Sequence, residues 1–226
     1  MSVPVITIDG PSGVGKGTVA RAVARQLNWH FLDSGSLYRI LALAAQKAGV
    51  ASDDASALAD LAPKLNIKFD LQRLDLETIV VDGHEISARI REETTGQLAS
   101  RVAIHPPVRA ALLERQRAFR RAPGLVADGR DMGTVVFPDA GLKIFLDASA
   151  DERARRRMIQ LRKAGIEPNM RALREEIRER DVRDRNRAVS PLKPADDAVT
   201  IDTTELSIDA VLERVAKLIE ARDYAT

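Results

Sequence analysis

The stretch Gly10-Pro11-Ser12-Gly13-Val14-Gly15-Lys16-Gly17-Thr18 decides the fold of this chain. It follows an apolar run over 3–9, which predicts a buried strand, and it opens a helical pattern over 16–27. A phosphate-binding loop needs this order of strand, glycine-rich loop and helix, because the first turn of a helix leaves backbone N–H groups available to an anion. Lys16 would add a positive charge between the outer phosphates. The sequence therefore predicts a nucleotide site at this loop.

The loop departs from the general pattern at one position. The spacing from Gly10 to Lys16 fits G-x-x-x-x-G-K, but Gly17 stands where Ser or Thr is usual, and the hydroxyl group arrives one residue later at Thr18. Direct ligation of magnesium by the loop is therefore left open. The alternative to a phosphate site is a glycine-rich turn that carries a surface lysine.

Length and composition restrict the class of protein. A chain of 226 residues can bury a full core, and the absence of cysteine excludes disulfides and thiolate zinc sites. There is no apolar run of membrane-spanning length and no leader-like segment, so we expect a soluble, cytoplasmic protein. The net charge of +2 is small for a protein that coats nucleic acid, although the pI is near 9.0.

Five apolar runs predict the sheet. They cover 3–9, 30–33, 125–128, 142–147 and 198–202, and helical patterns separate them over 16–27, 37–49, 53–64, 91–102, 106–120, 151–163, 171–187 and 206–219. This alternation predicts an α/β fold, an open five-stranded parallel sheet with helices on both faces and ligands beyond the carboxyl ends of the strands. Alternating apolar residues over 67–71, 74–77 and 78–81, with a turn at 82–84, predict a small antiparallel insertion over about 65–90.

Polar residues follow two of these strands. Asp128 ends an apolar run, where a carboxylate beside a phosphate loop could hold magnesium or its waters, or could simply cap the next turn. Ser34 and Arg39 follow the second run and could hold a second anionic group. Alternatively, Ser34 or Ser36 caps the next helix, and Arg39 is a solvated side chain.

The segment 151–187 is rich in arginine. Thirteen Arg or Lys residues stand against eight Asp or Glu residues, a local charge of +5, and a Gly- and Pro-containing break over 164–169 separates two charged helical patterns. Two such helices predict a flap that closes over phosphates and excludes water. Helical spacing puts Arg153 and Arg157 on one face, and Arg180, Asp184 and Arg187 on another. Many of the remaining arginines are expected to form ordinary salt bridges within their helix.

Taken together, four motifs make the chain resemble the bacterial cytidylate kinases, a family of P-loop nucleoside-monophosphate kinases. They are the phosphate loop, the turn 33–35, the stretch Asp128-Gly129-Arg130-Asp131-Met132-Gly133-Thr134 and the Arg/Asp-rich run 180–187. The resemblance covers essentially the whole length, including the antiparallel insertion. In this family the Gly17-Thr18 ending of the loop is usual, so the departure from the general pattern supports the resemblance.

The resemblance implies a P-loop NTPase-like core over about 1–34, 121–152 and 188–226, an NMP-binding region over about 35–120 and a lid over about 153–187. It implies transfer of a phosphoryl group from ATP, with Mg²⁺, to CMP or dCMP. For this reaction, the residues inferred above from the loop, the strand end and the helical spacing are the catalytic candidates Lys16, Asp128, Arg153 and Arg157, and Thr18 and Asp128 are the candidates for the metal, through water. By the same likeness, the acceptor phosphate is held by Ser34, Arg39, Arg130 and Arg187, the cytosine by Ser100, Arg109 and Asp131, and the sugar by Arg180 and Asp184.

Two other functions stay open at this stage. One is a P-loop kinase for UMP or another small anionic acceptor, and the other is an RNA-binding P-loop protein that uses the +5 segment. Asp131 favours cytosine, because a carboxylate accepts from its exocyclic amine and repels the carbonyl of uracil. The expected partners are small nucleotides, with no nucleic acid, no membrane and a monomeric state.

Overall fold

The computed structural model describes residues 2–70, 78–81, 83–163, 165–222 and 224. The chain divides into two compact units. The first unit comprises Met1–Asp33 and Arg117–Thr226, and the second comprises Ser34–Gln116.

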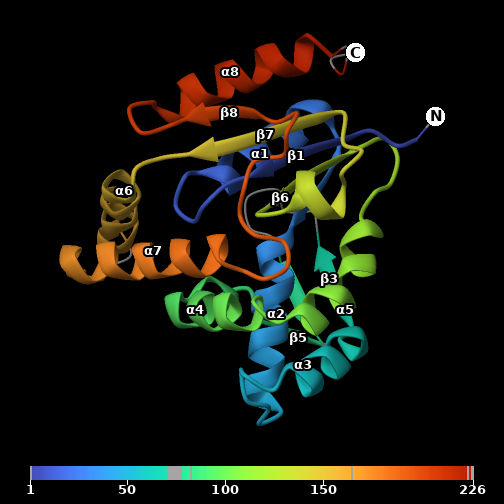
Figure 1. Ribbon diagram of the computed structural model, residues 1–226, viewed down its shortest axis with the longest axis vertical. Coiled ribbons are helices and arrows are strands. Elements are labelled where there is room, and N and C mark those ends of the chain that lie inside the picture. Colours follow the sequence, from blue (N-terminus) through green and yellow to red (C-terminus); the bar gives the residue numbers. More distant parts are fainter. Residues whose placement is uncertain (1, 71–77, 82, 164, 223, 225–226) are drawn as a thin grey trace. The chain divides into compact units, whose positions relative to one another are not determined.

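The first unit is built on a five-stranded sheet in the order β2-β6-β1-β7-β8, in which every pairing is parallel (Figure 1). The strands are β1 (Val5–Asp9), β2 (His30–Asp33), β6 (Leu125–Gly129), β7 (Leu142–Asp147) and β8 (Val199–Asp202). This architecture confirms the predicted fold class. Each strand ends at or one residue after an aspartate, so the carboxyl edge of the sheet carries a row of carboxylates.

Two α-helices, α1 (Lys16–Leu27) and α8 (Ile208–Glu220), and the π-helix η3 (Met132–Val136) pack against the sheet of the first unit. The unit also contains α6 (Ala150–Lys163) and α7 (Met170–Arg185), which pack against each other. Ile6 and Ile8 of β1 pack in one apolar core with Val19 of α1 and Val215 of α8. Side chains alternate along a strand, so Thr7 lies on the other face, where it contacts η3 at Gly133. The two faces of the sheet are therefore covered by different elements.

The second unit packs helices around α2 (Ser34–Lys47) and a small antiparallel sheet in the order β3-β4-β5. Ile40 and Leu41 of α2 lie in a core with Leu58, Val102 and Leu112. The other elements of this unit are α3 (Ala55–Leu61), η1 (Ala62–Lys64), β3 (Ile67–Asp70), β4 (Thr78–Val81), β5 (His84–Glu85), η2 (Arg89–Arg91), α4 (Glu93–Val102) and α5 (Pro106–Arg117).

The structure corrects two predicted helix boundaries and adds one helix. The helix expected from Leu37 begins at Ser34, so Ser34 and Ser36 are buried in its first turn instead of capping it from outside. The helix expected to reach 120 ends at Arg117, and the π-helix over 132–136 was not predicted. The strand predicted over 74–77 lies outside the described residues. Among the described helices, none has the length and apolarity to cross a membrane.

Candidate active site

The loop between β1 and α1 closes tightly on its neighbours. Gly10 has a φ of +148°, and a Cβ placed there would lie 2.0 Å from the backbone oxygen of Leu146 on β7. Gly13 has a φ of +82°, and its Cβ would lie 3.3 Å from the Cβ of Arg153 on α6. Gly10 therefore needs glycine on grounds of space, and the positive φ of Gly13 favours glycine on grounds of conformation. The loop delivers the chain to α1, which begins at Lys16 after Gly15.

Lys16 is enclosed at the start of α1. Its ammonium group donates to the carbonyl oxygen of Pro11 at 2.8 Å, which holds the side chain back along the loop. Burial, followed by the positive charge of Arg130, lowers the pKa of Lys16 to about 7. Phosphate oxygens bound in the loop would favour the charged form. The lysine thus lies where the sequence predicts a phosphate ligand.

Asp128, near the end of β6, lies beside the loop. Burial raises the pKa of Asp128 to about 6; the charge of Lys16 opposes this shift, and the charge of Asp33 on the paired strand adds to it. A Cβ on Gly17 would lie 3.3 Å from Oδ2 of this carboxylate. Gly17 therefore leaves room for the Asp128 carboxylate at the position where the general loop pattern has a hydroxyl side chain.

The residues present suit a magnesium ion bound together with a nucleotide. Mg²⁺ prefers oxygen ligands and usually takes one or two carboxylates plus substrate phosphates and water. Asp128 offers such an oxygen next to Gly17, and Thr18 is exposed one position further along α1. In the described part of the chain, no group of three or more His, Cys, Asp or Glu residues could hold an ion by itself. The donor set thus fits an ion that arrives with phosphate ligands.

Arginines surround one carboxylate of α7. Asp184 is 2% exposed and accepts from Nε of Arg130 at 2.9 Å and from Nη2 of Arg187. Burial alone would raise the pKa of Asp184, but the charges of Arg130, Arg187 and Arg180 lower it to about 2. The same interaction outweighs the effect of burial on Arg130 and raises the pKa of that guanidinium. Three of the residues predicted for the acceptor phosphate and sugar therefore make direct contact.

Asp131, predicted to contact cytosine, lies immediately before η3 and is buried. The two residues after it are fixed by Asp9 at the end of β1. Oδ1 of Asp9 accepts from the backbone N–H of Met132 at 2.9 Å, and Oδ2 accepts from that of Gly133 at 2.8 Å. Burial raises the pKa of Asp9 to about 7 despite these two bonds. Asp9 thereby ties the strand that feeds the phosphate loop to the turn that carries Asp131.

The arginines of α6 make different contacts. Arg153 is 2% exposed, and its guanidinium is hydrogen-bonded to Asp181, Ser12 and Ala148. Arg157 is half-buried and donates from Nη1 to the side chain of Gln160 at 3.3 Å. The contact of these two arginines with the transferred phosphoryl group stays a prediction, but the structure gives the Arg153 guanidinium protein partners.

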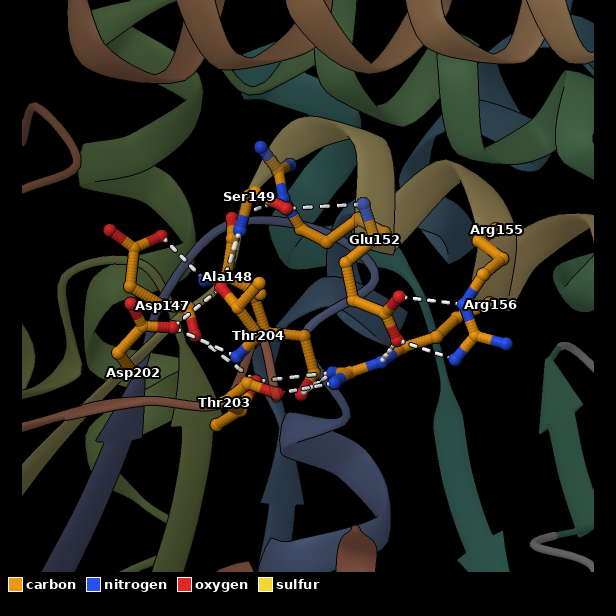
Figure 2. Close-up of polar contacts among 11 residues, drawn as sticks. Asp147, Ala148, Ser149, Glu152, Arg155, Arg156, Asp202, Thr203 and Thr204 are labelled. Atoms are coloured by element: carbon orange, nitrogen blue, oxygen red, sulfur yellow. Dashed lines mark hydrogen bonds and ion pairs between the residues drawn. The ribbon is translucent and has the colours of Figure 1, made fainter. Parts of the chain in front are cut away.

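Arg156, between them, joins α6 to the end of β8 (Figure 2). Nη1 of Arg156 donates to Oγ1 of Thr203 at 3.1 Å and to the carbonyl oxygen of Val14 at 3.4 Å. Thr203 in turn donates from its backbone N–H to the carbonyl oxygen of Asp147 at 2.8 Å. Glu152 binds both Arg155 and Arg156, which confirms that part of the arginine-rich segment forms salt bridges within its helix. Arg156 thus links the phosphate loop, at Val14, to the residue that follows β8.

The other predicted acceptor residues lie in the second unit. Arg39 donates to the carbonyl oxygen of Ile90 at 2.8 Å, and it lies so close to α4 that a Cβ on Gly96 would be 2.9 Å from its Nη2. The Arg109 guanidinium lies over the ring of Tyr38, with its carbon 5.5 Å from the ring centroid. Ser34 and Ser100 are both buried. Helix α2 therefore carries Arg39, and through Tyr38 it contacts Arg109 of α5.

Two residues of this site were missed in the sequence. Asp9 ends an apolar strand beside the loop, as Asp128 does. The reasoning that selected Asp128, a carboxylate at the end of such a strand, could also have selected Asp9. Asp181 stands in a run of alternating charges, and no local signal separates it from its exposed neighbours. Its burial depends on a residue that lies 28 positions away.

A family model and several related sequences agree on one family. The family model described as cytidylate kinase matches residues 6–221. A cytidylate kinase from Stutzerimonas stutzeri is 58% identical over 224 residues, which cover 99% of this chain and 98% of that protein. One from Edwardsiella ictaluri is 59% identical, covering 93% of each chain, and one from Pseudomonas aeruginosa is 57% identical, covering 99% and 98%. With its phosphate loop and its Arg130–Asp184–Arg187 group, the chain belongs to the cytidylate kinase family.

Proposed function

We propose that this protein transfers the γ-phosphoryl group of ATP to CMP or dCMP, giving ADP and CDP or dCDP. The observation that carries the proposal is the pairing, in one unit of the chain, of a phosphate-binding loop with a buried lysine and an arginine group around Asp184. The first is suited to the donor phosphates and the second to the phosphate and sugar of an acceptor. The family assignment supports cytosine as the base.

The donor half of the site is the loop from Gly10 to Thr18. Its backbone N–H groups and the start of α1 would bind the phosphates of ATP. Lys16 would exchange its hydrogen bond with Pro11 for the outer phosphates and neutralise charge on the transferred group. Mg²⁺ would be held by Asp128, directly or through water, with Thr18 nearby, and when bound it neutralises phosphate charge.

The acceptor half of the site consists of charged and polar side chains that would bind CMP. Arg130 and Arg187 would hold the CMP phosphate, and Arg180 with Asp184 the sugar. Asp131 would accept from the exocyclic amine of cytosine and would repel the carbonyl that uracil has in its place. We propose that Ser34, Arg39, Ser100 and Arg109 of the second unit also contact the acceptor, as the sequence resemblance implies.

The reaction needs little covalent help from the protein. An oxygen of the CMP phosphate forms a bond to the γ-phosphorus while the bond from that phosphorus to the β–γ bridging oxygen breaks. The acceptor is already an oxyanion at neutral pH, so no strong general base is required. Arg157 would stabilise the equatorial oxygens, and Arg153, which keeps its bonds to Ser12 and Asp181, would position the loop. Closure of the α6–α7 segment would exclude water.

Several properties remain part of this proposal. The expected partners are small nucleotides, with no nucleic acid and no membrane, and the expected state is a monomer in the cytoplasm. The regions about 35–120 and 153–187 are proposed to act as the NMP-binding region and the lid.

The test is a panel of single acceptors. Purified protein is supplied with ATP and Mg²⁺ and, separately, CMP, dCMP, UMP and AMP, and ADP release is measured. The proposal predicts the highest kcat/KM for CMP and dCMP. Better turnover of UMP or AMP would point to another acceptor, and salt-sensitive RNA binding with no turnover would point to the RNA-binding alternative.

A further inference from the structure

The Arg153 guanidinium is almost completely satisfied by protein. Its Nε donates to the carbonyl oxygen of Ala148 at 3.0 Å, and its Nη1 donates to the carbonyl oxygen of Ser12 at 3.2 Å. Both of its Nη atoms bind the Asp181 carboxylate, at 2.9 and 2.5 Å. The Arg153 side chain is 2% exposed and that of Asp181 is 10% exposed. This two-point pair fixes the direction of both side chains.

Stability alone does not account for such a pair. The desolvation of two charges often costs as much as their attraction returns, so an apolar pair of similar size is commonly as stable. The same two helices also carry ordinary exposed pairs, such as Arg174–Asp151, with side chains 47% and 62% exposed. Unlike the exposed pairs, the buried pair fixes three segments at one point: the phosphate loop, α6 and α7.

Two of these segments, the phosphate loop and α7, have distinct roles in the proposed reaction. Ser12 belongs to the phosphate loop, and the next residue, Gly13, packs directly on Arg153. Asp181 follows Arg180 on α7 and precedes Asp184 by one turn of the helix. Arg153 thus contacts the donor loop with one nitrogen and holds, through Asp181, the helix that carries the acceptor side chains.

We propose that Arg153 and Asp181 are positioning residues that couple ATP binding to CMP binding. The inference rests on the proposed function, because it assigns the loop to ATP and α7 to CMP. A nucleotide that orders the loop also fixes the Ser12 carbonyl, Arg153 and Asp181, and so prepares Arg180 and Asp184 for the acceptor. By linkage, CMP then strengthens the binding of ATP by the same factor.

The experiment measures this coupling at equilibrium. Isothermal titration calorimetry gives the Kd of CMP with and without a saturating non-hydrolysable ATP analogue, in the presence of Mg²⁺. The wild-type protein is expected to bind CMP at least about fivefold more tightly with the analogue. Asp181→Asn keeps only one acceptor oxygen and so cannot bind both Nη atoms of Arg153. This ratio is therefore expected to fall below about twofold, while the Kd for CMP alone changes little.

Glu179→Gln is the matched control. Glu179 lies on the same helix and also pairs with an arginine, Arg183, at 3.7 Å, but its side chain is 60% exposed. It should keep the wild-type ratio. Arg153→Lys provides a second variant if Asp181→Asn fails to fold, because lysine keeps the charge but cannot bind two oxygens at once in this geometry. Its ratio should also fall.

The outcomes separate this inference from the proposed function. If the wild-type protein binds neither nucleotide, the proposed function fails. If it binds both, but the ratio is near one, or if folded Asp181→Asn or Arg153→Lys keeps the wild-type ratio, only the coupling is overturned. An equal loss in Glu179→Gln would also overturn it, since charge on α7 in general would then be responsible.

Discussion

Replacing Asp184 with asparagine tests how the acceptor side is held together. The carboxylate is 2% exposed and accepts from both Arg130 and Arg187. Asparagine has nearly the same shape, but it removes the negative charge and turns one acceptor oxygen into an NH₂ donor that faces a guanidinium. The variant therefore leaves buried positive charge without its compensating anion.

The magnitude follows from two observations. The pKa of Asp184 lies at about 2, below the ordinary value of 3.8, and this shift corresponds to about 2 kcal/mol in favour of the ionised form in the folded protein. Removing one partner of a buried pair usually costs about 3–5 kcal/mol. We therefore expect Asp184→Asn to lower the free energy of unfolding by about 2–4 kcal/mol at neutral pH.

Urea unfolding followed by the fluorescence of Trp29, the single tryptophan, measures this loss. The sign of the pH dependence is also fixed. The pKa of Asp184 is depressed on folding, so its contribution is fully present above the unfolded value and is lost only as the pH falls toward about 2. The difference between wild type and variant should therefore be the same at pH values of about 5 and 8.

Glu179→Gln is the control here as well, and its effect should stay below about 1 kcal/mol, because its ion pair is exposed. A loss in Asp184→Asn no larger than that of the control would refute the reasoning. So would a difference that disappears between pH values of about 8 and 5, because the carboxylate would then titrate far above the pKa assigned to it.

Three further predictions concern the loop and the turn after β6. Lys16→Ala should abolish turnover with CMP while circular dichroism shows a retained fold; near-normal turnover would remove the lysine from catalysis. Asp131→Ala should raise the KM for CMP and relax the choice of base, so an unchanged CMP:UMP preference would exclude it from base recognition. Asp9 has a pKa raised from 3.8 to about 7, so the stability of wild type relative to Asp9→Asn should fall as the pH rises through that range, by up to about 4 kcal/mol, and then level off. A flat difference over that range in urea unfolding would count against the burial of an ionisable Asp9.

The sheet could be predicted from local sequence because each of its strands is an apolar run that ends in an aspartate. The phosphate loop could also be predicted from local sequence, because Gly10 and Gly13 have a positive φ that other residues rarely adopt. The π-helix after Asp131 could not be found in this way. Its first N–H groups are bound by Asp9, more than 120 residues earlier, so its geometry is a tertiary effect.

The arginine-rich segment shows a second limit of sequence reasoning. Helical spacing placed Arg153 and Arg157 on one face and suggested a common role, but spacing says nothing about what lies opposite each residue. In the structure, Asp181 and Ser12 bind Arg153, whereas Arg157 bonds to Gln160 on its own helix. Charge runs predict solvated faces well, and the exceptions depend on contacts between helices.

The central claim is that the acceptor is a cytidine monophosphate. The most direct measurement supplies CMP and UMP at equal concentration in one reaction with ATP and Mg²⁺ and resolves CDP from UDP by chromatography during the first turnovers. The competition reports the ratio of the two kcat/KM values without separate fits. We expect CDP to form in large excess. Equal amounts of the two products, or an excess of UDP, would contradict it.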